Sequence, residues 1–217
     1  MLSYLNNLFG IEPKPKPVES IHIPLPDNVQ KNPYDFVVQK ILAESSDSYI
    51  TGSYVYKRLL MANTAGDIDV TVPDTMKFSQ RLQEKYNAVP DTSTVFSEPY
   101  EYYWKLTMDG VHVDLLNRGE IKRKNKLDTF INTIKFTSDG FQHKRGVKLN
   151  ADPQTLSDQD KFDQDQMKFV MENLKQGRFC EWGDMRPKDH EYFGKFQKIP
   201  QSECEKFFFF PNATLSK

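Results

Sequence analysis

Cysteine is scarce in this chain of 217 residues, which holds only Cys180 and Cys204. The two lie far apart, with no CxxC spacing and no histidine cluster beside them, which excludes a zinc site of the kind that a sequence reveals. We therefore expect two reduced thiols. Long apolar runs are also missing, because no segment approaches the roughly 18 consecutive apolar residues of a membrane-spanning helix. We expect no membrane partner.

An excess of charge of either sign is absent as well. The chain has 29 basic and 30 acidic residues, which gives a formal net charge of −1. No global charge therefore indicates a nucleic-acid or membrane surface as partner, and any such contact must be local. The N-terminal residues have neither a basic stretch nor a small-residue cleavage site, so they are not expected to act as a signal peptide. We predict a cytoplasmic protein.

The length allows one sizeable core with a smaller appendage. Residues 12–18 are rich in proline and cannot be helical, so we assign 1–30 to an N-terminal arm with a proline-rich linker. We assign 31–149 to a core domain and 150–217 to a C-terminal extension with one main helix. The expected fold is α/β, with a small mixed sheet flanked by helices. Hydrophobic spacing predicts helices at 32–45, 54–61, 75–86 and 157–174, and strands at 48–51, 67–72, 102–108 and 111–116. The helix at 54–61 is expected to bury Val55, Leu59 and Leu60. Ser157 is expected to cap the helix at 157–174, whose pattern includes Phe162, and the four phenylalanines at 207–210 to form a docked or interface tail.

The most informative stretch contains Gly52-Ser53 after a short strand and Asp67-Ile68-Asp69 on the next strand. Glycine lets the backbone approach a phosphate, and serine adds a hydroxyl and an amide at the start of the following helix. Lys57 lies on that helix, where its ammonium could reach a nucleotide. Asp67 and Asp69 are two residues apart on a strand, so their side chains point to the same face. The combination indicates a metal and phosphate site.

A third carboxylate, Asp114, lies on a later strand that a hairpin turn at Asp109-Gly110 introduces. Three aspartates on neighbouring strands can hold two Mg²⁺ ions, which prefer carboxylate oxygens and keep several waters. Two such ions about 3.5–4 Å apart stabilise both the attacking and the leaving oxygen of a phosphoryl transfer. We predict Asp67 and Asp69 as ligands of both ions. Asp114 is predicted to complete the catalytic site nearest the attacking hydroxyl.

Gly52-Ser53, the spacer, Asp67-Ile68-Asp69-Val70 and the later strand aspartate together resemble the signature of the nucleotidyltransferase superfamily typified by DNA polymerase β. The resemblance covers about residues 45–140. It implies the nucleotidyltransferase fold and the transfer of a nucleoside monophosphate from ATP or another NTP to a hydroxyl. Pyrophosphate would be released, with Mg²⁺ or Mn²⁺ as cofactor.

Residues 128–136 are similar to a segment of the head domain of CCA-adding enzymes and bacterial poly(A) polymerases. Asp128, Ile131 and Asn132 match, and the resemblance implies nucleotide contacts from Asp128 and Asn132. Lys126-Leu127 stands where that family has two arginines. The resemblance makes an RNA 3′ end, of the kind that tRNA presents, the first choice of acceptor.

Other interpretations stay open at this stage. The acceptor is alternatively a protein or small-molecule hydroxyl, and the chain is alternatively an inactive nucleotidyltransferase-fold protein that only binds its partner. Five basic residues between Arg118 and Lys126 would meet triphosphate or an RNA backbone, or would form a solvated loop. His112 shares a strand face with Asp114 and is either a site residue or a surface group. The base preference and the oligomeric state do not follow from the sequence.

Overall fold

A computed structural model describes residues 23, 32–91, 103–117, 130–180 and 187–208 of the chain. Within these ranges seven strands form one sheet in the order β3-β4-β5-β2-β1-β6-β7. The strands are β1 (Tyr49–Thr51), β2 (Ile68–Val72), β3 (Val89–Pro90), β4 (Tyr103–Met108), β5 (Val111–Asn117), β6 (Ile134–Thr137) and β7 (Gly140–His143). The pair β2–β5 is parallel and the other pairs are antiparallel. The prediction of an α/β fold with a mixed sheet is confirmed.

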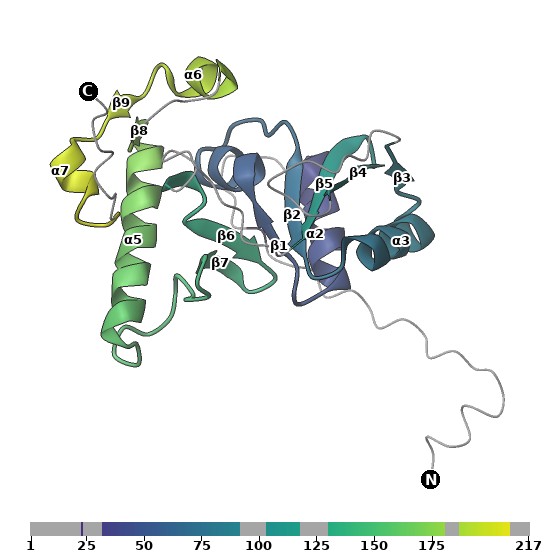
Figure 1. Cartoon of the computed structure of the whole chain (residues 1–217), viewed down its shortest axis with the longest axis horizontal. Coiled ribbons are helices and arrows are strands. Elements are labelled where there is room, and N and C mark those ends of the chain that lie inside the picture. Colours follow the sequence, from purple (N-terminus) through teal and green to yellow (C-terminus); the bar gives the residue numbers. More distant parts are fainter. Residues whose placement is uncertain (1–22, 24–31, 92–102, 118–129, 181–186, 209–217) are drawn as a thin grey trace, which may run out of the picture.

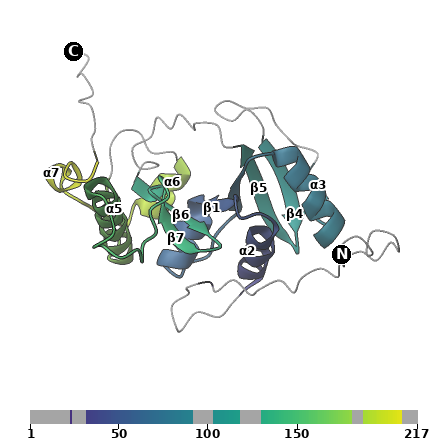
Figure 2. The same ribbon diagram turned by 90° about the horizontal axis from the view of Figure 1, so that it is seen from below.

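Helices lie at both ends of this sheet (Figure 1). Helix α3 lies beside β3, β4 and β5, and the long helix α5 lies at the opposite end beyond β6 and β7 (Figures 1 and 2). No helix in the described ranges is long and apolar enough to cross a lipid bilayer. The helices are α2 (Pro33–Glu44), η1 (Tyr54–Leu60), α3 (Thr75–Tyr86), α5 (Asp158–Lys175), α6 (Pro187–Phe193) and α7 (Gln201–Cys204).

Local sequence accounts for where α2 and α3 begin and end. The side chain of Asn32 accepts a hydrogen bond from the amide of Asp35, and the Asp35 carboxylate accepts one from the amide of Asn32. This reciprocal capping satisfies two amides that the first helical turn leaves unpaired. Asp74 caps α3 by accepting a hydrogen bond from the amide of Lys77, and Asn87 ends the helix in the left-handed conformation. The predicted start of α2 and both predicted bounds of α3 are therefore confirmed.

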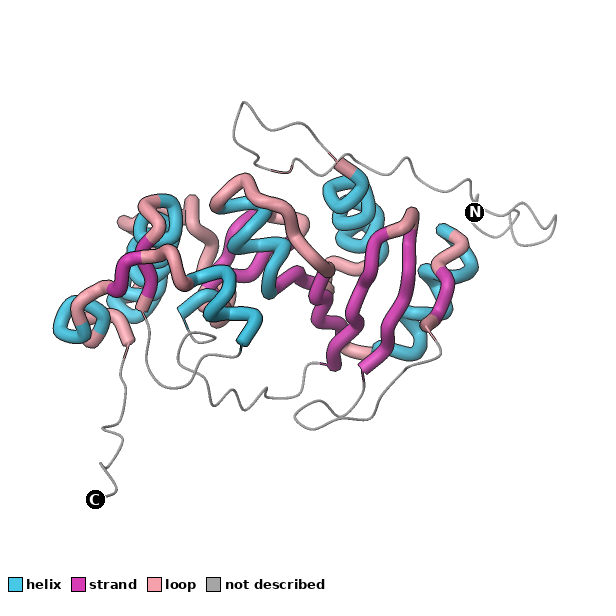
Figure 3. The backbone as a smooth tube through the Cα atoms, turned by 90° about the horizontal axis from the view of Figure 1, so that it is seen from above, coloured by secondary structure: helices cyan, strands magenta, loops and turns pink. Residues whose placement is uncertain are grey.

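The hairpin β4–β5 delivers Asp114 to the centre of the sheet. Asp109 and Gly110 both have positive φ, 50° and 77°, as a tight two-residue hairpin turn requires. The turn places β5 antiparallel to β4 and parallel to β2, with Asp114 opposite Lys105 on one side and Asp69 on the other. In Figure 3 β4 and β5 run side by side as the two longest magenta strands.

The helix after Ser53 differs from the ordinary α-helix that the spacing predicts. Residues Tyr54–Leu60 form a π-helix, η1, whose wider turn is rare and frequently occurs at functional sites. Tyr54 and Arg58, both on η1, donate hydrogen bonds to the buried carboxylate of Asp35 on α2. The predicted apolar stripe of this helix, Val55, Leu59 and Leu60, is buried. Long-range contacts, which local periodicity does not report, therefore accompany the wider helix.

Helix α5 contributes to the same hydrophobic core as the sheet. Its residues Met167, Val170 and Leu174 belong to the same buried cluster as Ile50, Val70 and other strand residues. The serine N-cap predicted for this helix, Ser157, accepts a hydrogen bond from the amide of Asp160. Phe162, which belongs to the spacing that predicts this helix, is 40% exposed. It lies one turn from the solvent-exposed N-terminal end of α5 and stacks on Phe207.

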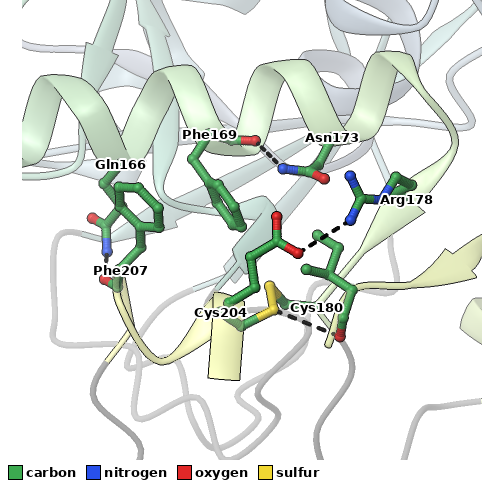
Figure 4. Close-up of a disulfide and its surroundings, with 9 residues drawn as sticks. Gln166, Phe169, Asn173, Arg178, Cys180, Cys204 and Phe207 are labelled. Carbon is green, nitrogen blue, oxygen red and sulfur yellow. Dashed lines mark hydrogen bonds and ion pairs between the residues drawn. A yellow bond between two sulfur atoms is a disulfide. The ribbon is translucent and has the colours of Figure 1, made fainter. Parts of the chain in front are cut away.

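The segment after α5 folds back onto it and is held by a disulfide between Cys180 and Cys204 (Figure 4). The short strands β8 (Arg178–Phe179) and β9 (Gln197–Lys198) pair in parallel, which brings the two cysteine Cα atoms to 6.2 Å, within bridging range. The prediction of two reduced thiols is therefore wrong. Sequence spacing did not reveal the pair, because the β8–β9 contact creates it. The cellular compartment stays a prediction.

The end of the described chain packs against α5. The side-chain amide of Gln166 donates to the carbonyl of Phe207, and the Phe207 ring stacks on Phe169 with centroids 4.4 Å apart (Figure 4). Phe208 is buried against Phe130. These contacts agree with a docked aromatic tail at residues 207 and 208, and residues 209 and 210 lie outside the described ranges.

Candidate functional site

The three predicted aspartates converge at the middle of the sheet. Asp67 precedes β2, Asp69 is on β2 and Asp114 is on β5. Each offers one carboxylate oxygen, and these atoms lie within 4.8 Å of one another. All three side chains are half-buried. In the described part of the chain, no other group of three or more metal-ligating side chains is this close. We call this group the aspartate cluster.

The aspartate cluster belongs to a row of side chains that crosses four strands. The register pairs Thr51 with Asp69, Asp69 with Asp114, and Asp114 with Lys105. Directly opposed residues on neighbouring strands project from the same face of a sheet, so the four side chains share one face. Their strand neighbours on the other face, such as Val70 and Val113, are fully buried. Neither Thr51 nor Lys105 was predicted as a site residue, because pairing between strands is not visible in the sequence.

Ser53 holds Asp67 in place. Its hydroxyl donates to Oδ1 of Asp67 at 2.8 Å and lies 3.1 Å from the Asp67 backbone carbonyl oxygen. The hydroxyl hydrogen is therefore engaged by the aspartate cluster. The predicted role of the Gly52-Ser53 turn in holding phosphate stays a prediction. Ser53 thus connects the turn to the cluster directly, a link that the thirteen intervening residues conceal in the sequence.

Gly52 lies against Asp69. Its φ is +68°, a conformation that other residues adopt at a cost, and a Cβ placed there would collide with the Asp69 carboxylate. Its amide donates to Oδ1 of Asn132 at 3.3 Å. The structure therefore brings together four of the predicted residues on this side of the aspartate cluster: Gly52, Ser53, Asn132 and Asp69.

The remaining predicted site residues have different surroundings. The ammonium of Lys57 lies 4.2 Å from the ring centroid of Tyr192 on α6, a cation–π contact. His112 is exposed and lies opposite Thr107, two residues from Asp114 on the same face. Asp128 and the basic run at 118–126 lie outside the described residues. The roles predicted for all of these residues stay predictions.

Comparison with known proteins gives little further guidance. No protein-family model and no curated protein matches the chain. A solved apo form of a CCA-adding enzyme is similar, with a TM-score of 0.44 and 14% identity over 80% of this chain and 42% of that chain. A complex of a CCA-adding enzyme with CTP gives a TM-score of 0.40 and 16% identity over 72% and 37%. This chain spans about two fifths of the length of those proteins. Likeness at this level establishes no shared activity.

The residues themselves fit a divalent cation. Carboxylate oxygens are the ligands that Mg²⁺ and Mn²⁺ prefer, and three of them lie close enough to share such ions. Without a cation, three negative charges at this separation repel one another. The buried hydroxyl of Thr51, in the same row, has no hydrogen-bond partner among the described residues. Since buried polar groups are nearly always partnered, this orphan atom also favours a bound polar group here.

Replacing Gly52 by alanine tests the close contact between the turn and the aspartate cluster. We expect Gly52→Ala to destabilise the fold by about 1–2 kcal/mol, because alanine resists positive φ. We also expect weaker Mn²⁺ binding, because the new Cβ displaces the Asp69 carboxylate. Urea unfolding and Mn²⁺ titration calorimetry measure the two effects. Gly146→Ala is the matched control, since Gly146 also has positive φ but a Cβ there meets no atom within 4 Å. Equal loss of Mn²⁺ affinity in both variants would contradict the prediction.

Proposed function

We propose that this protein is a metal-dependent nucleotidyltransferase that moves a nucleoside monophosphate from an NTP to a hydroxyl and releases pyrophosphate. The observation that carries the proposal is the convergence of Asp67, Asp69 and Asp114 beside the Gly52-Ser53 turn. An RNA 3′ end is the first choice of acceptor, and a protein or small-molecule hydroxyl is the alternative.

The chain's own residues would divide the work between two sides of the cluster. Asp67 and Asp69 would hold Mg²⁺ or Mn²⁺, and Asp114 would lie nearest the incoming hydroxyl, where a carboxylate can accept its proton. Ser53 would keep the Asp67 carboxylate oriented. A bound divalent cation would neutralise charge on the phosphate oxygens. Gly52, which has no side chain, would let the Asp69 carboxylate lie directly against the turn, where both could face a bound phosphate.

A second function, binding without catalysis, has its own support. Lys126-Leu127 replaces the arginine pair of the RNA-acting relatives that the sequence resembles. A nucleotidyltransferase scaffold that binds NTP or a macromolecule without turnover would retain the aspartate cluster and the Gly52-Ser53 turn. The two functions differ in one measurable property, the formation of a covalent product.

Incubation of the full chain with each α-labelled NTP, Mg²⁺ or Mn²⁺, total RNA and total protein tests the proposal. We expect label to enter the RNA fraction and a chelator to abolish incorporation. Label in protein alone would move the acceptor to a protein hydroxyl. Metal-dependent NTP binding by calorimetry, with no label transferred, would favour the binding function. Incorporation that survives the chelator would contradict a metal-dependent reaction.

A further inference from the structure

Lys105 lies in register with the aspartate cluster and has no assigned role. It is the β4 residue directly opposite Asp114, and its half-buried side chain shares the face of Asp114 and Asp69. The row therefore reads Thr51, Asp69, Asp114, Lys105 from β1 to β4. A cation ends the row on the side away from the Gly52-Ser53 turn. This position places the Lys105 ammonium where it could contact a substrate of the aspartate cluster.

If the proposed function holds, the geometry of phosphoryl transfer indicates which substrate lies near Lys105. The attacking and leaving oxygens lie roughly in line on opposite sides of the phosphorus. The Gly52-Ser53 turn flanks the cluster on the β1 side, where the proposed function places the triphosphate and its leaving pyrophosphate. The acceptor hydroxyl must then approach from the opposite side, over β5 and β4. Lys105 is on that side.

We propose that Lys105 is an acceptor-binding residue whose ammonium contacts the phosphodiester next to the reacting 3′ hydroxyl of a polynucleotide. A lysine ammonium is a compact positive charge that binds phosphate. A polynucleotide carries a negative phosphodiester next to its terminal hydroxyl, whereas a serine or tyrosine acceptor has no such anion beside its hydroxyl. Because the Lys105 side chain is half-buried, such a contact is stronger than one made in open solvent. The inference rests on the proposed function and narrows its acceptor from any hydroxyl to a nucleic-acid 3′ end.

The acidic neighbours of Lys105 define the competing interpretation. Asp114 lies opposite it on β5, and the amide of exposed Asp91 donates to the Lys105 carbonyl from the β3 side. An ammonium that serves only to neutralise these carboxylates would leave acceptor binding unchanged when it is removed, and would change metal or NTP affinity instead. The two roles therefore predict different kinetic signatures.

The test compares the full-length wild-type chain with Lys105→Gln and with a matched control, Lys135→Gln. Lys135 is also a half-buried strand lysine, but it lies on β6 over the ring of Tyr49, on the other side of the cluster. Two RNA oligonucleotides serve as acceptors. One has a normal last linkage, and the other has an uncharged methylphosphonate between its last two nucleotides. Anisotropy of the 5′-labelled oligonucleotides measures binding, and single-NTP extension measures turnover.

For the normal RNA we expect Lys105→Gln to raise the dissociation constant and the acceptor KM about ten- to hundredfold, the range for a lost charge-assisted contact. The KM for NTP should stay unchanged. The slope of log K against log salt should fall by about 0.7, as for one phosphate contact to a single strand. The methylphosphonate should weaken RNA binding by wild type and by Lys135→Gln by a similar factor. It should not weaken RNA binding by Lys105→Gln further, because that variant already lacks the contact that the methylphosphonate removes.

Two results would overturn the inference. In one, the methylphosphonate weakens RNA binding by Lys105→Gln and by wild type equally. In the other, Lys105→Gln changes metal or NTP affinity but not RNA binding. Transfer of label to protein and not to RNA would also overturn it while leaving the proposed function intact. If the wild-type chain transfers no label at all, the proposed function fails, and the anisotropy comparison still decides whether Lys105 contacts the terminal phosphodiester.

Discussion

Asp69→Asn should reduce nucleotide transfer more than any other change described here and should at the same time stabilise the metal-free protein. Asparagine preserves the shape of the side chain but removes one of three negative charges whose oxygens lie within 4.8 Å. We expect turnover to fall about a thousandfold or more, which corresponds to roughly 4 kcal/mol of lost transition-state stabilisation. Because like charges repel, the melting temperature in the presence of a chelator should rise.

Opposite signs for activity and stability separate a functional carboxylate from a structural one. Mg²⁺ or Mn²⁺ should raise the melting temperature of the wild-type chain, because a ligand that binds only the folded state stabilises it, and should leave Asp69→Asn unchanged. Asp109→Asn is the matched control. It lies on the same hairpin as Asp114, its exposed ion pair with Lys40 is of the kind that contributes little, and asparagine tolerates its positive φ. Asp69→Asn that keeps wild-type turnover would refute the role of the aspartate cluster.

The second large effect concerns Asp35, a fully buried carboxylate outside the site. It accepts hydrogen bonds from Nε and Nη2 of Arg58, at 3.1 and 2.7 Å, and from the Tyr54 hydroxyl at 3.0 Å. Burial, and next the nearby Asp35 charge, raise the pKa of Tyr54. Asp35→Ala would leave the buried guanidinium and the phenol without their acceptor. We expect a loss of about 3–5 kcal/mol in the free energy of unfolding, the range for removing one member of a buried ion pair.

Urea unfolding of single and double variants tests this expectation. Asp35→Leu combined with Arg58→Met removes both charges, so it should recover much of the stability lost in either single variant. Asp74→Ala is a control that removes an exposed helix cap and should cost much less than Asp35→Ala. A loss in Asp35→Ala no larger than in this control, or a double variant no more stable than the singles, would contradict the prediction. Since Tyr54 and Arg58 lie on η1 directly after Ser53, the same network positions the turn beside the aspartate cluster.

Much of the site was visible in the sequence because its signals are short-range. Side chains alternate along a strand, so Asp67 and Asp69 point to the same face. The Asp109-Gly110 dipeptide predicts the turn of the hairpin that carries Asp114. Gly52 matters for its backbone, which glycine permits in any fold. The joint placement of the three aspartates was a hypothesis from the motif, and the parallel pairing of β2 with β5 brings them together.

Other features had no short-range signal. The contact of Asp35 with Arg58 joins residues 23 apart, and nothing in α2 or η1 alone indicates it. The π-helical winding of η1 departs from the period that its apolar residues suggest. The disulfide joins cysteines 24 residues apart, which lie next to or beyond the paired strands β8 and β9.

The amino-acid sequence was sufficient to predict the main helices, four strands and the chemistry that they carry: capped helices, alternating strands, a tight hairpin, and carboxylates beside a Gly-Ser turn. Those properties follow from backbone preferences and side-chain type over a few residues. Tertiary structure alone decided which residues meet, because register and strand order depend on packing across the whole core. It placed Ser53 on Asp67, Gly52 against Asp69 and Lys105 opposite Asp114. That arrangement gives the aspartate cluster two different sides, one toward the turn and one toward β4.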